Sequence, residues 1–264
     1  TQELSTISQI LLQKEELEIA SRFLYTLFLR EDFKQNSPLR AKVLYQLFRT
    51  FSDAENHKLP LAKGDLRFYE DVAKADSNPG ITTGILSLIF SDKKKKKKFD
   101  EQEGKTTRFF NRAAAYRIFE EYKTEFPTSP ELAQMYLDIV RIYTAEKETK
   151  IAENVLTEFA ERYENSTSYA DAALKLADAF AAVKRTEKER EIYQKVLDFL
   201  GKTDKPKFAR TDEISYGEVL EKFVASFAKE KKTAEILALY SSEIEKYPTE
   251  EMLYEQRLSQ LEKT

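Results

Sequence analysis

The chain lacks cysteine and tryptophan, and its 264 residues include only one histidine, six glycines and seven prolines. Without cysteine, disulfides, thiol nucleophiles and cysteine-ligated metal sites are excluded. The lone histidine, His57, has no second histidine or cysteine with which to share a zinc ion, so we expect it to be a surface residue without a functional role. Few glycines and prolines beside 34% charged residues favour long, solvated helices over sheets or disorder.

Two further absences concern membranes and nucleic acid. No run of 18 apolar residues occurs, so the sequence predicts no membrane span. The net charge is only −3, so the molecule as a whole is not expected to attract nucleic acid. The chain begins at Thr1 without a recognisable signal peptide, which indicates processing or truncation. We therefore expect a soluble protein and leave the compartment open between cytoplasm and periplasm.

Signatures of catalysis are missing as well. The sequence contains no glycine-rich phosphate loop, no G-x-S-x-G element and no kinase motif. Carboxylate pairs such as Glu120 and Glu121 are typical of helix surfaces, and nothing singles out one pair for general acid–base work. We expect no enzymatic activity, no cofactor and no metal.

What the chain does contain is an internal repeat with a period of 37 residues. Five positions of one copy align with five of the next: Tyr136, Ile139, Tyr143, Ala152 and Leu156 with Ala173, Leu176, Phe180, Glu189 and Tyr193. A period of this size predicts a stack of similar helix pairs, in which each unit buries its apolar faces only against its neighbours. Stacks of this kind usually present a binding surface and perform no chemistry.

These residues resemble the tetratricopeptide repeat family. That family's consensus combines large and aromatic residues in two paired helices with an alanine where the helices approach and a proline that ends the second helix. Further matches to this pattern are Ala115, Phe119 and Pro127, then Phe223, Phe227, Tyr240 and Pro248, and fewer at the amino end, Ile7, Leu11, Ala20 and Leu24. Glu189 and Ile236 stand where the family has alanine, and Val140 stands where it has a small residue. The resemblance implies an all-α superhelical stack of about five to six antiparallel helix pairs.

Helical spacing and the positions of proline and glycine predict where the elements lie. We expect helices over 38–52, 112–125, 129–143, 147–163, 168–183, 186–200, 212–229, 232–247 and 250–262, with Gly201 as a left-handed cap after the sixth. They divide the chain into divergent amino-terminal helical repeats over 1–92, a lysine-rich polar linker over 93–105, and tetratricopeptide-like repeats over 106–264. The last helix has no partner, so it either caps the stack or begins a further unit of a longer array.

The resemblance also implies where a ligand would bind. In the family, the first helices of the pairs line a concave face, and the corresponding open positions here are Gln134, Arg141, Asp171, Asp178, Glu218 and Glu221. This set lacks the lysines and asparagines with which some members clamp carboxy-terminal peptides, and it is somewhat acidic toward the carboxyl end. A basic or amphipathic peptide is therefore the expected ligand, although an ordinary solvated surface explains the same residues equally well.

A run of six lysines is the strongest local charge: Lys93, Lys94, Lys95, Lys96, Lys97 and Lys98. Such a run can attract phosphate, nucleic acid or anionic lipid. Acidic residues follow it directly, and neither an aromatic ring nor an arginine interrupts it to stack on a base or to grip a phosphate. An exposed loop is the simpler interpretation, and nucleic acid is a disfavoured partner.

Together these features predict a non-catalytic scaffold or adaptor that binds a protein or peptide. The turn Phe126-Pro127-Thr128-Ser129 resembles turns of bacterial envelope members of the family, including outer-membrane assembly lipoproteins, which implies an exported bacterial adaptor. Three alternatives stay open: a helical-repeat protein that binds RNA or another anionic ligand through the lysine run, a docking or regulatory segment of a larger protein, and a self-associating structural stack.

Overall fold

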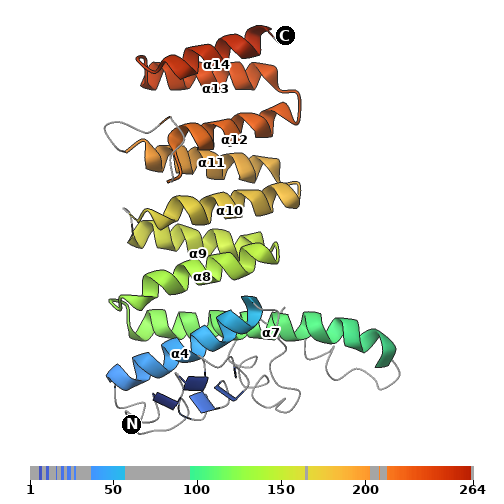
Figure 1. Cartoon of the computed structure of the whole chain (residues 1–264), viewed down its shortest axis with the longest axis vertical. Coiled ribbons are helices and arrows are strands. Elements are labelled where there is room, and N and C mark those ends of the chain that lie inside the picture. Colours follow the sequence, from blue (N-terminus) through green and yellow to red (C-terminus); the bar gives the residue numbers. More distant parts are fainter. Residues whose placement is uncertain are drawn as a thin grey trace. The chain divides into compact units, whose positions relative to one another are not determined.

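All described secondary structure of the chain is helical. A computed structural model describes residues 37–56, 96–163, 166–202 and 213–262, together with Phe208 and single positions near the amino end. Within these residues the helices, labelled in Figure 1, are α4 (Ser37–Asn56), α7 (Lys96–Glu125), α8 (Glu131–Ala145), α9 (Thr149–Arg162), α10 (Ser168–Ala182), α11 (Thr186–Leu200), α12 (Tyr216–Ala228), α13 (Thr233–Lys246) and α14 (Glu251–Glu262). The prediction of an all-α chain is confirmed for this part, and none of its helices is long and apolar enough to cross a membrane.

The chain forms two compact units, Thr1–Tyr143 and Thr144–Thr264. In the first unit, α4 packs along α7 and buries Leu44, Phe48 and Phe51 completely. The ring of Phe119 in α7 lies edge-on to that of Tyr136 in α8, with centroids 4.8 Å apart. Aromatic rings in this geometry attract beyond the area they bury, so α7 and α8 are joined by a specific contact.

A buried arginine fastens α4 to the end of α7. The guanidinium of Arg40 donates from Nε to Glu125 at 2.6 Å and from Nη2 to Glu121 at 2.6 Å, with only 10% of its side chain exposed. The hydrogen bond from Arg40 holds the pKa of Glu125 below its ordinary value, whereas burial raises that of Glu121. Forked, charge-assisted contacts of this kind fix orientation as well as distance, so they set how α4 crosses α7.

Helix α7 begins earlier than the sequence indicated. Residues 96–105, which we predicted as part of a polar linker, continue without a break into the helix that ends at Glu125. The physical reason is that lysine, glutamate and glutamine form helices well even where no apolar face guides them, and one interior glycine costs only about 1 kcal/mol. Lys93, Lys94 and Lys95 lie outside the described residues, and Lys96, Lys97 and Lys98 form the first turn of α7, of which only the backbone is described.

In the second unit, each helix from α9 to α14 packs against the next helix along the chain (Figure 1). Helix α10 shows what this requires, because it packs against both α9 and α11. Its buried side chains include five alanines, Ala170, Ala172, Ala173, Ala177 and Ala179, and small side chains let helices approach closely. Packing between sequence neighbours is the arrangement expected of an α-helical repeat.

One turn geometry occurs three times. Among the described residues other than glycine, only Lys147, Lys184 and Lys231 have positive φ, at 63°, 58° and 56°. Each donates its backbone N–H to the carbonyl three residues earlier at 3.0 Å, and each stands two residues before the threonine that begins the next helix. A left-handed lysine costs about 1 kcal/mol, so its recurrence at three helix-to-helix connections marks a turn that the repeat requires.

The turns that precede α8, α10 and α14 form a second recurring set. In each, the residue three positions after an aromatic donates its N–H to the carbonyl of that aromatic, at 3.1, 2.9 and 3.1 Å, the aromatics being Phe126, Tyr163 and Tyr247. Between α11 and α12 the chain carries Gly201 and the polar insert over 202–211 instead. The third left-handed lysine is displaced from the 37-residue period by the length of that insert.

Gly201 is not the left-handed cap that we predicted. Its φ is −75°, in the right-handed region, and a Cβ atom there would lie 2.7 Å from the hydroxyl of Tyr247. A glycine is therefore needed for close approach. The same holds for Gly217 at the start of α12, whose Cβ would lie 2.1 Å from the carbonyl oxygen of Phe208. Phe208 is buried, with its ring 5.0 Å from that of Tyr216, so this residue of the insert is anchored on α12.

Replacing Gly217 by alanine is predicted to destabilise the protein. In an ordinary helix this change stabilises by about 0.5–1 kcal/mol, but here the added methyl group overlaps backbone, and overpacking costs about 1–3 kcal/mol. Urea denaturation of Gly217→Ala measures the free energy of unfolding. Gly201→Ala serves as a graded control with a smaller loss, because the hydroxyl end of Tyr247 can move aside; a more stable Gly217→Ala protein would contradict the described contact.

Candidate binding surface

Helix α10, the first helix of a predicted pair, leaves one narrow stripe open to solvent. Most of α10 is buried, and its exposed positions follow one face of the helix at three- and four-residue spacing. They are Ser168, Asp171, Lys175, Asp178 and Ala182. The equivalent positions on α8 are Gln134, Asp138, Arg141 and Ala145, of which Asp138 is buried. Along α12 they are Glu218, Lys222, Ala225 and the C-cap Lys229, of which the first two are half-buried. We call these sets the α8, α10 and α12 stripes.

All six residues predicted to line a groove are accessible. Gln134, Arg141, Asp171, Asp178 and Glu221 are exposed and Glu218 is half-buried. Gln134 and Arg141 belong to the first unit and the other four to the second. Glu218 also has a local role, because its backbone N–H is capped at 3.1 Å by the side chain of Ser215, the residue before α12.

In the α8 stripe, Gln134 and Arg141 both contact Asp138, an acid that was not among the predicted site residues. Asp138 is buried and accepts from Arg141 at 2.6 Å and from Gln134 at 3.2 Å. On α10, Lys175 pairs with Asp171 at 2.6 Å, whereas Asp178 makes no ion pair with any cation that the structure describes. The α10 stripe therefore offers a carboxylate whose charge no described side chain neutralises.

Two polar groups of α11 lie near both the α10 and the α12 stripes. Glu189 and Tyr193 are buried, with Tyr193 donating to Glu189 at 3.3 Å, and Lys229 of the α12 stripe lies 3.8 Å from the same carboxylate oxygen. Burial, and then the negative charges of Glu189 and Asp178, raise the pKa of Tyr193. The charges of Asp178 and Lys229 therefore both act on the Glu189–Tyr193 pair of α11.

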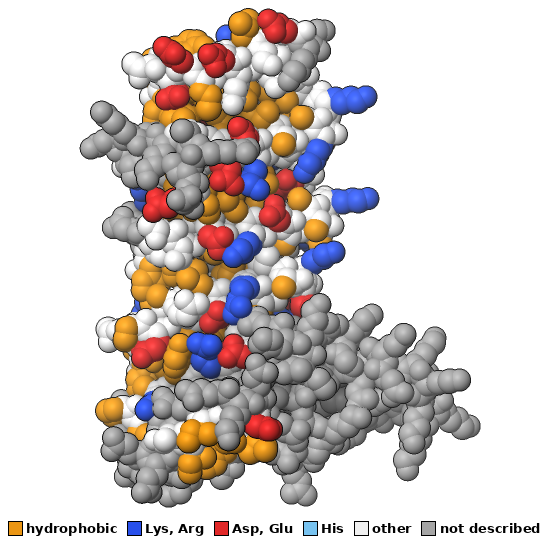
Figure 2. All heavy atoms as spheres, viewed as in Figure 1, with side chains coloured by type: hydrophobic (Ala, Val, Ile, Leu, Met, Phe, Trp, Pro, Cys, Tyr) orange, Lys and Arg blue, Asp and Glu red, His pale blue; other side chains and the backbone are white. Residues whose placement is uncertain are grey.

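One pair further along, a second-helix tyrosine is again influenced by a first-helix acid, although that acid, Glu221, lies four residues before the equivalent of Asp178. Tyr240 of α13 occupies the place of Tyr193, and burial followed by the charge of Glu221 on α12 raises its pKa to about 12. Each of these predicted acids thus lies close enough to a second-helix tyrosine to influence its proton. On the face drawn in Figure 2, acidic and basic side chains are interspersed over the described helices.

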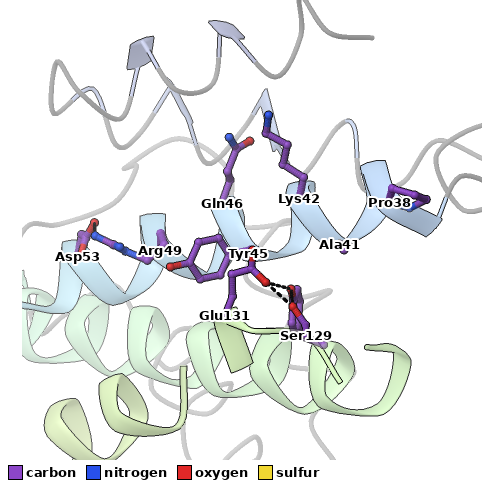
Figure 3. A pocket seen from close by; sticks show the side chains of 10 residues that line it. Pro38, Ala41, Lys42, Tyr45, Gln46, Arg49, Asp53, Ser129 and Glu131 are labelled. Carbon is purple, nitrogen blue, oxygen red and sulfur yellow. Dashed lines mark hydrogen bonds and ion pairs between the residues drawn. The ribbon is translucent and has the colours of Figure 1, made fainter. Parts of the chain in front are cut away.

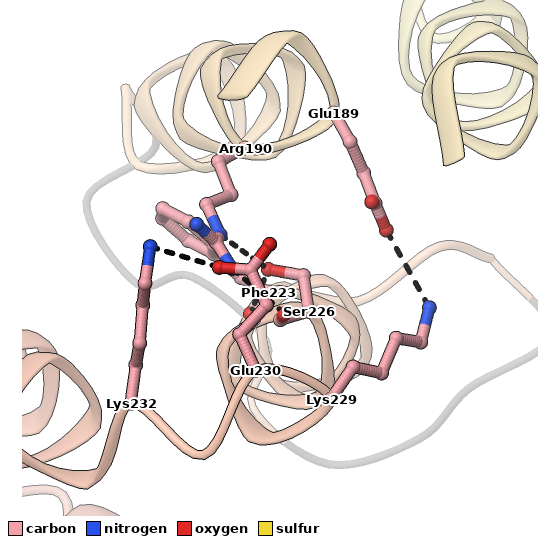
Figure 4. Close-up of polar contacts among 7 residues, drawn as sticks. All are labelled: Glu189, Arg190, Phe223, Ser226, Lys229, Glu230 and Lys232. Carbon is pink, nitrogen blue, oxygen red and sulfur yellow. Dashed lines mark hydrogen bonds and ion pairs between the residues drawn. The ribbon is translucent and has the colours of Figure 1, made fainter. Parts of the chain in front are cut away.

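A buried arginine joins α11 to the end of α12 (Figure 4). Arg190 donates to the carbonyl of Ser226 at 2.8 Å, to its hydroxyl at 3.2 Å and to Glu230 at 2.9 Å, and its guanidinium lies 4.1 Å from the ring centroid of Phe227. Lys232 also contacts Glu230, at 2.8 Å. This cluster holds two helices together through partners of its own, so it is a structural element beside the candidate surface.

A cleft of about 750 Å³ in the first unit was not predicted from the sequence (Figure 3). The hydroxyl of Tyr122 lies 2.6 Å from that of Ser129, which is hydrogen-bonded to Glu131, and this bond lowers the pKa of Glu131. Arg49 pairs with Asp53 at 3.3 Å. Paired charges and hydroxyls suit a polar ligand; the lining residues are Pro38, Ala41, Lys42, Tyr45, Gln46, Arg49, Asp53, Tyr122, Ser129 and Glu131.

Among the side chains that the structure describes, no three histidine, aspartate or glutamate residues gather as a metal site requires. His57 lies outside the described residues. No model of a known protein family matches the chain, and no curated protein is similar to it. The described part of the chain is helical, and within it the helices from α9 to α14 pack on their sequence neighbours.

Replacing Arg190 by alanine is predicted to lower the free energy of unfolding by about 2–4 kcal/mol, because it leaves buried acceptors without a donor and empties the space over Phe227. Arg190→Lys restores the charge but not the forked guanidinium, so its free energy of unfolding should lie between those of the native chain and of Arg190→Ala. Chemical denaturation gives the values, with Arg185→Ala, an exposed arginine at the start of the same helix, as the matched control. Equal losses of unfolding free energy in Arg190→Ala and Arg185→Ala would contradict the role of Arg190 in holding α11 to α12.

The contact between Arg190 and Glu230 predicts a pH dependence. Hydrogen bonds from Lys232 and Arg190 lower the pKa of Glu230 from 4.5 to about 2. Because the folded state lowers this pKa, the stabilisation is complete above pH 4.5 and disappears as pH falls toward 2. The free energies of unfolding of the native chain and of Glu230→Gln, measured by urea titration, should therefore differ at pH 6 and converge on acidification. A constant difference between pH 6 and pH 2 would contradict the lowered pKa of Glu230.

Proposed function

We propose that the chain is a non-catalytic scaffold of the tetratricopeptide type, which binds a protein or peptide along the α10 and α12 stripes. The observation that carries the proposal is the burial of α10, which leaves a stripe one side chain wide as its open face. The recurrence of the two turn geometries and the neighbour-to-neighbour packing support a repeat of this kind. In such a repeat the first-helix faces are where a ligand has continuous access.

The charges of the surface favour a ligand with basic side chains. Asp178 on α10 makes no ion pair with any cation in the part of the chain that the structure describes, and the nearest cation to Glu189 there, Lys229, lies at the long distance of 3.8 Å. A lysine or arginine side chain of the ligand would neutralise Asp178 and lie near the Glu189–Tyr193 pair. Because Ala182 and Ala225 leave room beside these acids, an extended or helical peptide segment can approach the helix backbone.

The test compares two acid pairs of the same unit. Asp171→Ala with Asp178→Ala removes the acids of the α10 stripe, whereas Glu191→Ala with Asp198→Ala removes an equally spaced exposed pair from α11. A protein captured by the native chain should bind the α10 variant about tenfold or more weakly and the α11 variant unchanged, as expected for contacts at the centre of an interface. Isothermal titration of the captured protein measures both affinities.

Three outcomes would speak against this surface. Equal weakening by both variants would mean that only net charge matters. Binding that survives both variants, but is lost with salt or when the lysines over 93–98 become serine, would assign recognition to the lysine run and an anionic ligand. Failure to capture any protein that distinguishes the variants would remove the support for a scaffold.

A further inference from the structure

Helix α14 carries an uncovered apolar face. Tyr254, Leu258 and Leu261 are 47%, 58% and 45% exposed, and their spacing of four and three residues places them on one side of the helix. The other side of α14 packs against α13 (Figure 1). On that side Leu253 of α14 is fully buried, and Tyr240 of α13 donates to Gln256 of α14 at 2.9 Å. Single exposed leucines are ordinary, but a row of three large side chains on a packed helix marks a contact surface.

The edges of this face carry unequal charge. Glu251, Glu255 and Glu262 are all exposed and lie together along one edge by helical spacing, while the half-buried Arg257 lies along the other. The Nε of Arg257 is buried and has no hydrogen-bond partner among the described residues. The face therefore consists of an apolar centre, a row of three carboxylates on one side and a single cation on the other.

This charge pattern disfavours a second copy of α14 as the occupant. In an antiparallel pairing about a two-fold axis, the same edge of each helix meets its equivalent, so six glutamates would lie side by side. In a parallel pairing only Arg257 of each helix would oppose three glutamates. Like charges across an interface suppress the wrong partner, so a helix of opposite edge charge is preferred.

We propose that this face of α14 is a docking site for a basic amphipathic helix, with leucine-type side chains on its apolar stripe and lysines or arginines along the glutamate edge. Apolar anchors at four- and three-residue spacing would interdigitate with Tyr254, Leu258 and Leu261, as in other helix–helix contacts. The lysines would pair with the carboxylates at the rim, where such pairs set specificity and encounter rate. The site is separate from the α10 and α12 stripes, so binding at this face of α14 is tested independently of binding along the stripes.

The experiment uses the full chain and two synthetic helical peptides. Both carry leucines at four- and three-residue spacing; one has lysines along one edge and the other has glutamates at the same positions. Fluorescence anisotropy should show the lysine peptide binding and the glutamate peptide binding at least about tenfold more weakly. Changing Glu251, Glu255 and Glu262 together to glutamine should weaken the lysine peptide and reduce the salt dependence of its affinity.

Leu258→Ser tests the apolar centre, and Ile19→Ser is its matched control, since Ile19 is 53% exposed outside α14. Only Leu258→Ser should weaken the lysine peptide, by about tenfold or more, with an unchanged melting temperature showing that the fold is kept. Equal binding of the two peptides, or indifference to Leu258→Ser, would overturn the proposal. So would a concentration-dependent dimer in sedimentation that Leu258→Ser abolishes, because a second copy would then be the occupant.

Discussion

The close approach of helices that follow one another in sequence is the constraint on which the second unit depends. Each helix from α9 to α14 packs on the next, so its apolar side chains must fit that neighbour and the turn between them must place it correctly. Alanines on α10 and glycines at 201 and 217 allow the backbones and rings to come together. Lys184 and Lys231 accept a left-handed conformation for the same reason, because the strain at one residue is offset by the packing of α9 to α14 on one another.

This packing also decides where the molecule can interact. A helix covered by its neighbours keeps only a stripe of open positions, and on α10 that stripe is polar and holds a carboxylate, Asp178, that no described cation pairs with. The buried Arg190 cluster and the Glu189–Tyr193 pair lie between α11 and α12 and have their own partners, so they support the stripes without themselves being open to a ligand. Recognition along the stripes and docking on α14 use different surfaces of one unit.

The sequence predicted the parts of the fold that depend on local pattern. Helix α11 has the predicted ends, and Ala152, Glu189 and Ile236 are buried although only one of them is alanine. The early start of α7 was missed because a lysine-rich segment has no apolar period to reveal a helix. The Lys-x-Thr turns were visible in the sequence at 147, 184 and 231, but glycine, not lysine, is the residue that signals a left-handed turn. The cleft over α4 and the Arg190 bridge join residues far apart in sequence, which no local pattern encodes.

On the function proposed above, ligands reach the first-helix stripe and not the outer face of the second helix. A photo-crosslinking amino acid placed at position 182, on the α10 stripe, or at position 195, exposed on α11, tests it most directly. We expect position 182 to form a covalent adduct with a bound protein, and we expect this adduct to disappear in the Asp178→Ala background. Position 195 should form no adduct. An adduct from position 195 alone, or equal adducts from both positions, would contradict it.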